Sequence, residues 1–180
     1  MSPSKLPGGP TQDEVMAVAL FKLGLRDGDC MIDVGCGTGK VSIAAAHIGA
    51  NVIAIDRRVE AIRFAKKESK RKRQKNIKFF CAEATEFLQD KDRIFDCAFV
   101  GGSHGLADFL PVLAKKVRRR IVVNAVLVST LHTTVAKMRE IGIFDEVVQV
   151  QIARSHAIAG SIMFRPIDPV YVIVGTGAAC

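Results

Sequence analysis

The sequence predicts an α/β fold, in which helices cover both faces of a seven-stranded, mostly parallel sheet. Short apolar runs alternate with longer amphipathic stretches along most of the chain. A glycine-rich turn, residues 35–39, joins the first apolar run, residues 30–34, to a helical stretch at residues 40–48. A second apolar run, residues 51–55, ends in the acidic Asp56. This order of elements is typical of a Rossmann-like sheet.

Length and composition indicate one domain. The chain has 180 residues, of which 49% are hydrophobic and 24% are charged, a balance that supports a single core. We therefore expect residues 1–180 to form one domain without an internal repeat. Residues 1–10 contain three prolines and two glycines, and we expect them to be irregular.

The remaining elements follow from hydrophobic periodicity and from end signals. Thr11 begins a Thr-Gln-Asp-Glu run, a capping-box pattern in which Thr11 caps the first helix and Glu14 reaches back to it. The predicted helices are residues 11–23, 40–48, 59–74, 106–116 and 129–141. The predicted strands are residues 30–34, 51–55, 77–81, 95–100, 120–126, 146–153 and 170–175.

The segment between the last two strands, residues 153–166, is longer than a tight hairpin turn. We predict a long loop, and long loops in compact domains are often functional. Two uses remain open: contact with a substrate, or a surface excursion that contacts another subunit.

The glycine spacing indicates which ligand the first turn binds. Gly39 comes one residue earlier than the third glycine of a dinucleotide fingerprint, and Asp33 ends the strand before the turn. This run resembles the cofactor loop of class I S-adenosylmethionine (SAM) methyltransferases. The resemblance implies that Asp33 serves the methionyl end and that Asp56, about 20 residues after the loop, accepts from the ribose hydroxyls. The loop residues expected around the cofactor are Gly35, Cys36, Gly37, Thr38 and Gly39.

The fourth predicted strand opens into Gly-Gly-Ser-His-Gly at residues 101–105. In such sheets the substrate meets the cofactor at the carboxyl end of a central strand. We expect Gly101 to lie beside the cofactor and His104 to be the histidine placed to move a proton. Class I methyltransferases bind adenine after the third strand, where this chain has Ala82, Glu83 and Ala84.

The cysteines and the apolar runs bear on location. Five cysteines show no C-x-x-C pairing, so we expect reduced side chains, without zinc or disulfides. No apolar run approaches the roughly 20 residues of a membrane span, and the N-terminus lacks a signal-peptide pattern. We therefore expect a cytoplasmic protein without a membrane partner.

Several motifs together resemble a narrower family. Four short motifs occur in this order along the chain: Pro-Gly-Gly-Pro-Thr, which ends at Thr11; Asp-Val-Gly-Cys-Gly-Thr-Gly, which ends at Gly39; Val-Gly-Gly-Ser, which ends at Ser103; and Ile-Ala-Arg, which ends at Arg154. In this order they resemble the decarboxylating cobalt-precorrin-6B C15-methyltransferases of anaerobic cobalamin biosynthesis. The similarity spans nearly the whole chain.

The resemblance implies both chemistry and contacts. The reaction would be SAM-dependent methylation at C15 with loss of CO2 from the C12 acetate, giving cobalt-precorrin-7. SAM contacts carry over onto Thr11, the 35–39 loop, Asp56 and Ala84. The family often has Gly-Asp-Ala where this chain has Ala-Glu-Ala, so Glu83 is a departure. The resemblance also implies a homotetramer that residues 154–165 help to build.

The net charge of +8 favours an anionic partner. A polycarboxylate tetrapyrrole fits this charge, and Arg154 and Arg165 could grip its carboxylates in a bidentate manner. The main alternative is an RNA methyltransferase, which the basic residues 66–75 and 118–120 favour. One tyrosine and no tryptophan argue against base stacking, so we expect no nucleic-acid partner. A second alternative is a non-catalytic SAM-binding subunit, although the cofactor loop is intact.

Overall fold

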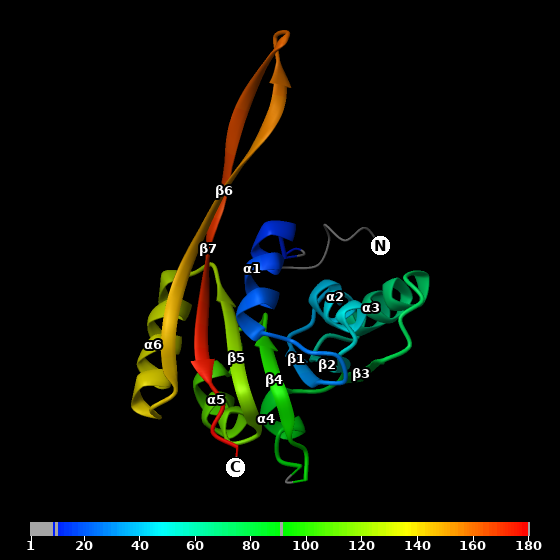
Figure 1. Ribbon diagram of the computed structural model, residues 1–180, viewed down its shortest axis with the longest axis vertical. Coiled ribbons are helices and arrows are strands. Elements are labelled where there is room, and N and C mark those ends of the chain that lie inside the picture. Colours follow the sequence, from blue (N-terminus) through cyan, green and yellow to red (C-terminus); the bar gives the residue numbers. More distant parts are fainter. Residues whose placement is uncertain (1–8, 10, 91, 180) are drawn as a thin grey trace.

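The computed structural model describes residues 9, 11–90 and 92–179 (Figure 1). Helices alternate with strands along the first two thirds of the chain, and two long strands end it. The strands are β1 Cys30–Val34, β2 Asn51–Asp56, β3 Ile77–Cys81, β4 Phe95–Val100, β5 Val117–Ala125, β6 Phe144–Ile158 and β7 Ser161–Thr176. The helices are α1 Asp13–Leu23, α2 Lys40–Ile48, α3 Val59–Arg71, α4 Ala84–Phe87, α5 Leu106–Ala114 and α6 Val128–Glu140.

All seven strands form one sheet in the order β3-β2-β1-β4-β5-β7-β6. The first five strands are parallel, while β7 runs antiparallel to β5 and β6 antiparallel to β7. The predicted fold class is therefore confirmed. The strand order reverses between β1 and β4, and ligands of open α/β sheets bind at the carboxyl ends of the strands at such a point.

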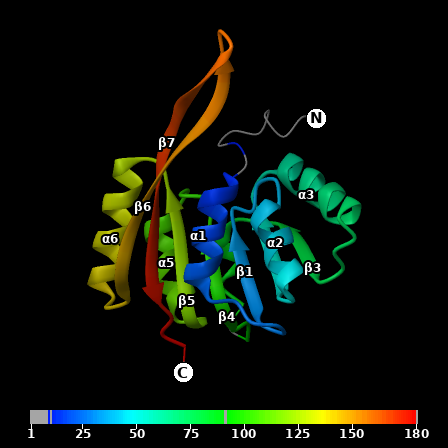
Figure 2. The same cartoon turned by 45° about the horizontal axis from the view of Figure 1, so that its top comes forward.

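Helices cover both faces of the sheet (Figure 2). On one face, α1, α2 and α3 bury residues such as Leu23, Ala45 and Ile62 against strand residues that include Met31. On the other face, α5 and α6 pack against alternate strand residues such as Ile32. Because both faces of β1 are covered, its apolar run is continuous, as is typical of parallel strands.

Several predicted element ends are wrong, and two of them have a clear local cause. The first helix begins at Asp13, the N-cap is Gln12, and it has no side-chain cap hydrogen bond, so Thr11 does not cap it. Glu14 accepts from Arg154 at 3.2 and 2.7 Å, and such a charge-assisted pair is stronger than a neutral capping bond. Likewise, α3 ends at Arg71 rather than at residue 74, because Arg73 adopts a left-handed φ of 57°.

The predicted loop at residues 153–166 is also wrong, because β6 and β7 continue through it as one long hairpin. Strand pairing runs from Ala153↔Pro166 out to Ile158↔Ser161. Ala159 and Gly160 form the turn, and both have positive φ, as a type I′ hairpin turn requires. Most side chains of this outer hairpin, residues 153–166, are exposed, and it projects beyond the sheet as an arm (Figure 1).

Candidate functional site

A cavity of about 380 Å³ opens at the carboxyl ends of β1, β2 and β4. A second, smaller cavity of about 80 Å³ adjoins it and shares Gly35, Arg58 and Gly101 with it. Among the predicted cofactor residues, Gly35, Asp56, Glu83, Ala84 and Gly101 line the larger cavity, together with His104. Thr11, Asp33, Gly35, Cys36, Gly37, Thr38 and Gly101 line the smaller one. The structure thus brings together residues from distant parts of the chain.

Gly35 lets the two central loops touch through their backbones. Its φ is +74°, and a Cβ built on it would lie 2.7 Å from the Gly102 nitrogen and 2.8 Å from the Gly102 Cα. No side chain fits between the loops, so only glycine allows this close approach. The turn after β1 and the turn after β4 are therefore held against each other at the floor of the cavity.

Gly39 has a different role from the other loop glycines. A Cβ on Gly39 would lie 2.8 Å from the Cβ of Ala65, and Gly39 lines neither cavity. This glycine lets the start of α2 pack closely against α3.

Asp33 carries an unsatisfied oxygen beside the smaller cavity. The side chain is fully buried, and one carboxylate oxygen accepts from the hydroxyl of Ser42. The other oxygen, Oδ1, has no hydrogen-bond partner among the described residues. Burial raises the pKa of Asp33 to about 7. The negative charge of Asp56 also raises this pKa, whereas the hydrogen bond from Ser42 lowers it. A buried polar atom without a partner is uncommon, and this one fits a ligand that brings a donor or a positive charge.

Asp56 is held as an anion in the lining of the larger cavity. It accepts from the backbone N–H of Gly37 at 2.9 Å and from Arg58 through its backbone N–H, Nε and Nη2 at 2.9–3.0 Å. Burial acts to raise the pKa of Asp56, but the hydrogen bonds from Arg58 and Gly37 outweigh it and hold the pKa below its usual value. The charged form suits an acceptor for ribose hydroxyls.

Arg58 and Lys40 line the site, and the sequence analysis did not identify them. Arg58 borders both cavities, and Lys40 borders the smaller one. Lys40 donates to the Thr11 carbonyl at 2.6 Å and pairs with Asp13 at 2.7 Å. The available signal was an arginine two residues after Asp56 and a lysine directly after the third loop glycine.

Arg154 lines neither cavity. It forms a two-pronged ion pair with Glu14, which connects the arm to the start of α1. Asp13 and its partner Lys40 lie next to this pair, so Arg154 is linked to the smaller cavity through neighbouring side chains.

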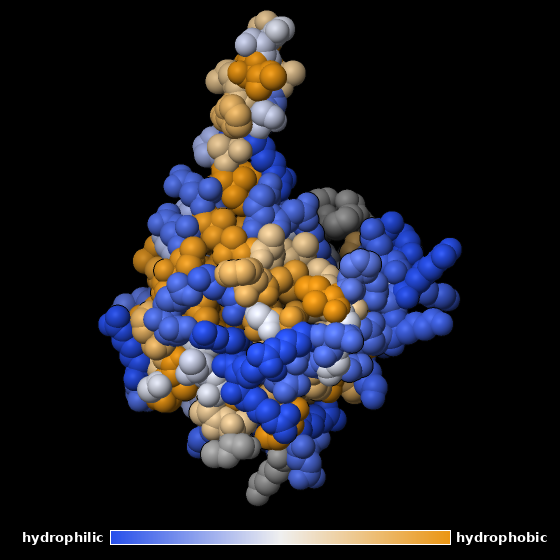
Figure 3. All heavy atoms as spheres, viewed as in Figure 1, coloured by the Kyte–Doolittle hydropathy of each residue, from blue (hydrophilic) through white to orange (hydrophobic). Residues whose placement is uncertain are grey.

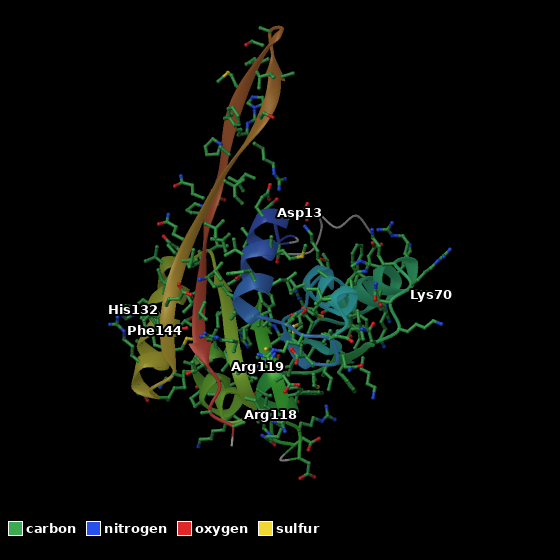
Figure 4. All side chains as sticks on the ribbon, in the orientation of Figure 1. Asp13, Lys70, Arg118, Arg119, His132 and Phe144 are labelled. Atoms are coloured by element: carbon green, nitrogen blue, oxygen red, sulfur yellow. The ribbon has the colours of Figure 1, made fainter. Side chains whose placement is uncertain are left out.

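The positive charge lies mainly away from the cavities. Residues 66–78 contain eight basic residues and one glutamate, which amounts to seven of the eight net positive charges. These residues belong to the end of α3 and to the edge strand β3, where Lys70 points outward (Figure 4). Figure 3 shows the same flank as strongly hydrophilic. The second basic run is neutralised, since Arg118, Arg119 and Arg120 pair with Asp96, Asp29 and Asp145.

Cysteines 30, 36, 81 and 97 are free. Within the described residues, no three or more His, Cys, Asp or Glu side chains are grouped to hold a metal ion. In that same part of the chain, no helix is both long and apolar enough to cross a membrane.

Comparisons with known proteins identify the family. A family model described as "Precorrin methyltransferase domain" matches residues 7–176. A Methanosarcina acetivorans protein named "Probable cobalt-precorrin-6B C(15)-methyltransferase (decarboxylating)" is 48% identical over 172 residues, which cover 93% of this chain and 94% of that protein.

Solved structures agree with this assignment. The structure of precorrin-8W decarboxylase from Methanobacterium thermoautotrophicum is 33% identical, covers 99% of this chain and 96% of its own, and superposes with a TM-score of 0.90. A precorrin-6Y C5,15-methyltransferase from Geobacter metallireducens is 31% identical, covers 98% of this chain and 94% of its own, and gives a TM-score of 0.89. The chain therefore belongs to the precorrin methyltransferase family, with the fold of a class I SAM-dependent methyltransferase.

Proposed function

We propose that this enzyme transfers a methyl group from SAM to C15 of cobalt-precorrin-6B and removes CO2 from the C12 acetate, giving cobalt-precorrin-7. The observation that carries the proposal is the unsatisfied oxygen of Asp33 next to the anionic Asp56, at the carboxyl ends of β1 and β2. The 48% identity to a named C15-methyltransferase supports the choice of substrate.

The two cavities fit the two ends of SAM. Asp33 Oδ1 would accept from the ammonium of the methionyl group, which fills the smaller cavity together with the loop N–H groups. Asp56 would accept from the ribose hydroxyls, and Glu83 and Ala84 would border the adenine in the larger cavity. When bound, SAM supplies an electrophilic methyl group on a sulfonium that leaves readily.

The protein's part in methyl transfer is alignment. The turns at Gly35 and Gly102 form a fixed floor on which the substrate carbon and the methyl group can be held in line, and such positioning supplies much of the rate in a displacement of this kind.

Decarboxylation requires the chain to hold the acetate, exclude water and guide a proton. Electrons released from the acetate pass into the conjugated ring of the substrate. His104 lines the mouth of the larger cavity, and we propose that it carries the proton. Arg154 is proposed to bind a substrate carboxylate with the donors that Glu14 leaves free.

We further propose a homotetramer in which the arm makes subunit contacts. Ile158, Ile162, Met163 and Phe164 are large apolar residues that lie exposed on the arm. Exposed apolar surface of this kind marks interaction sites. Replacing Ile162 and Phe164 by serine should lower the sedimentation coefficient, whereas Phe21→Ser on the exposed face of α1 should not. An unchanged oligomer in the arm variant would contradict the role of the arm.

The reaction is tested by incubating the protein with methyl-labelled SAM and cobalt-precorrin-6B, and with the cobalt-free ring in parallel. We expect the product to gain one labelled methyl group and lose one CO2. Methylation without CO2 loss, or no reaction with either ring, would contradict the proposal.

The basic flank at residues 66–78 is the observation that favours an RNA substrate instead. Transfer RNA and ribosomal RNA, offered with methyl-labelled SAM under the same conditions, should receive no labelled methyl group. We propose that the enzyme has no nucleic-acid partner and works in the cytoplasm, where free cysteines remain reduced.

A further inference from the structure

Three consecutive apolar residues are exposed where β5 ends and α6 begins. Val126, Leu127 and Val128 are 56%, 63% and 67% exposed. We call these three residues the β5–α6 platform. A run of consecutive exposed apolar side chains is avoided in soluble proteins unless it has a function.

The platform lies at the functional end of the sheet. It follows the carboxyl end of β5, and β5 pairs in parallel with β4, so that Val123 stands beside Val100. The turn that follows Val100 contains Gly101, Ser103 and His104, which line the larger cavity. The platform is therefore next to the turn where the substrate is expected to meet the cofactor.

A third cavity connects the platform to this turn. It has a volume of about 260 Å³ and lies between the beginnings of α5 and α6. Ser103 and Asp108 line it on one side, and Ser129, Thr130 and Thr133 line it on the other. Ser103 also lines the larger cavity, while Ser129 follows Val128 directly, so an apolar surface continues into a polar cavity and then into the larger cavity.

The end of β5 also carries unused hydrogen-bonding capacity. Neither the amide nitrogen nor the amide oxygen of Asn124 has a partner among the described residues, although both atoms are buried. By the register of Val123 with Val100, Asn124 lies beside Gly101, which lines both cofactor cavities. Unpaired buried amide groups at this position are consistent with a strand end that receives a ligand.

Size indicates what covers the platform. A cavity of about 380 Å³ suits one drug-sized ligand, so the cofactor occupies it and a macrocycle must lie outside, over its rim. The apolar residues of the arm that we assign to subunit contacts lie near its tip, at residues 158–164, and the arm tip is far from the sheet (Figure 1).

We propose that the β5–α6 platform is the floor on which the tetrapyrrole ring lies, with the edge of the ring over the polar cavity between α5 and α6. This inference rests on the proposed function. A flat conjugated ring offers an apolar face that matches Val126, Leu127 and Val128.

The test compares two exposed apolar positions. Leu127→Ser removes the centre of the platform, and Phe21→Ser is the matched control, because Phe21 is 81% exposed on α1. Both sites are on the surface, so both variants should fold. We measure binding of cobalt-precorrin-6B by its absorbance change in the presence of S-adenosylhomocysteine, SAM affinity by calorimetry, and oligomeric state by sedimentation.

We expect Leu127→Ser to weaken binding of cobalt-precorrin-6B about tenfold, or about 1.4 kcal/mol, while SAM affinity and sedimentation stay unchanged. Phe21→Ser should bind the ring as the wild type does. Unchanged binding by Leu127→Ser, or a loss that follows subunit dissociation, overturns the platform. If the wild type itself does not bind the ring, the proposed function has failed instead.

A second readout uses the absence of tryptophan from the chain. In Leu127→Trp the single indole should be open to acrylamide quenching and should become protected when cobalt-precorrin-6B binds. The indole of Phe21→Trp should remain equally accessible with and without the ring. If the ring binds to Leu127→Trp but the indole is quenched equally with and without it, the inference is contradicted.

Discussion

Arg58 contacts both carboxylate oxygens of Asp56, with Nε 2.9 Å from Oδ1 and Nη2 2.9 Å from Oδ2. The two residues are separated by a single residue at the end of β2. Both line the larger cavity, and Arg58 also lines the smaller one. Arg58 keeps Asp56 ionised and fixed in orientation. Four N–H donors, three from Arg58 and one from Gly37, already occupy the two oxygens, so a ribose hydroxyl would bind Asp56 in exchange for one of them.

The first prediction is that Asp56→Ala weakens SAM binding by more than tenfold. A buried pair of cofactor hydroxyls would lose a charged acceptor, which costs about 1.5–3 kcal/mol. Calorimetry of the folded variant measures the effect. Asp145→Ala is the control, because Asp145 pairs with Arg120 at the start of β5, away from the cavities. Equal affinity in Asp56→Ala and the wild type would remove Asp56 from the ribose site.

The second prediction concerns pH and Asp33, whose pKa is raised from 3.8 to about 7 by burial. Below pH 7 the folded protein keeps a proton that the unfolded chain has already lost. The free energy of unfolding without cofactor should therefore fall as pH rises from about 4 to about 7. Asp33→Asn should remove this dependence in thermal unfolding.

SAM affinity should show the opposite trend if Asp33 binds the ammonium. Between pH 5.5 and 7, roughly, affinity should rise with pH by up to about tenfold per unit, because only the ionised carboxylate attracts the cation. Asp56 stays ionised throughout this range, since its pKa is lowered. A wild-type affinity that is independent of pH would exclude Asp33 from contact with the ammonium.

The parallel part of the fold could be predicted because burial determines its sequence pattern. Met31 and Ile32 are both fully buried, one under each helix layer, so β1 reads as a continuous apolar run. The arm has no such constraint. Ile162 and Phe164 are exposed, so burial does not impose an alternation of polar and apolar residues there. The length of β6 and β7 follows from their pairing with each other.

The sequence could predict the residues of the candidate site that lie at or next to strand ends. Asp33 and Asp56 lie at strand ends, and the topology brings those ends together. Arg58 and Lys40 were missed because the reach of a long side chain depends on the packed structure. The pairing of Arg154 with Glu14 was missed for the same reason, because the two residues are 140 apart in the sequence. The overall charge was also a poor guide, because most of it lies at residues 66–78.

The third prediction is that Gly35→Ala is far more destabilising than Gly142→Ala. The two glycines have almost equal φ angles of +74° and +73°, so alanine pays the same left-handed strain of about 1–2 kcal/mol at each. Only Gly35 faces backbone atoms at 2.7 and 2.8 Å, while nothing lies within 4 Å of a Cβ on Gly142. Chemical denaturation should show the difference. An equal decrease in the free energy of unfolding in the two variants would mean that the turns at Gly35 and Gly102 can separate without loss of stability.

The fourth prediction is that the basic end of α3 is dispensable for catalysis. Replacing Lys70, Arg71, Lys72 and Arg73 by glutamine should leave turnover of the tetrapyrrole within a few-fold, because these residues form the end of α3 and the turn toward the edge strand β3 and line neither cofactor cavity. Steady-state kinetics at low and high salt provide the measurement. A collapse of turnover, or tight salt-sensitive RNA binding by the wild type that the variant loses, would revive the RNA alternative.

The last prediction separates two roles for Arg154. Its Nε and Nη2 donate to Glu14, which leaves the other guanidinium donors free for a substrate carboxylate. If Arg154 binds substrate, Arg154→Lys should raise the KM for the tetrapyrrole tenfold or more without changing SAM affinity, because lysine lacks the planar fork. Glu14→Gln breaks the same ion pair but keeps the guanidinium, so its KM should stay within about twofold of the wild type. If Arg154 only fastens the arm to α1, the two variants should change KM and sedimentation to the same extent. Kinetics and sedimentation on the same preparations decide between the roles. Wild-type KM and sedimentation in both variants would contradict both roles of Arg154.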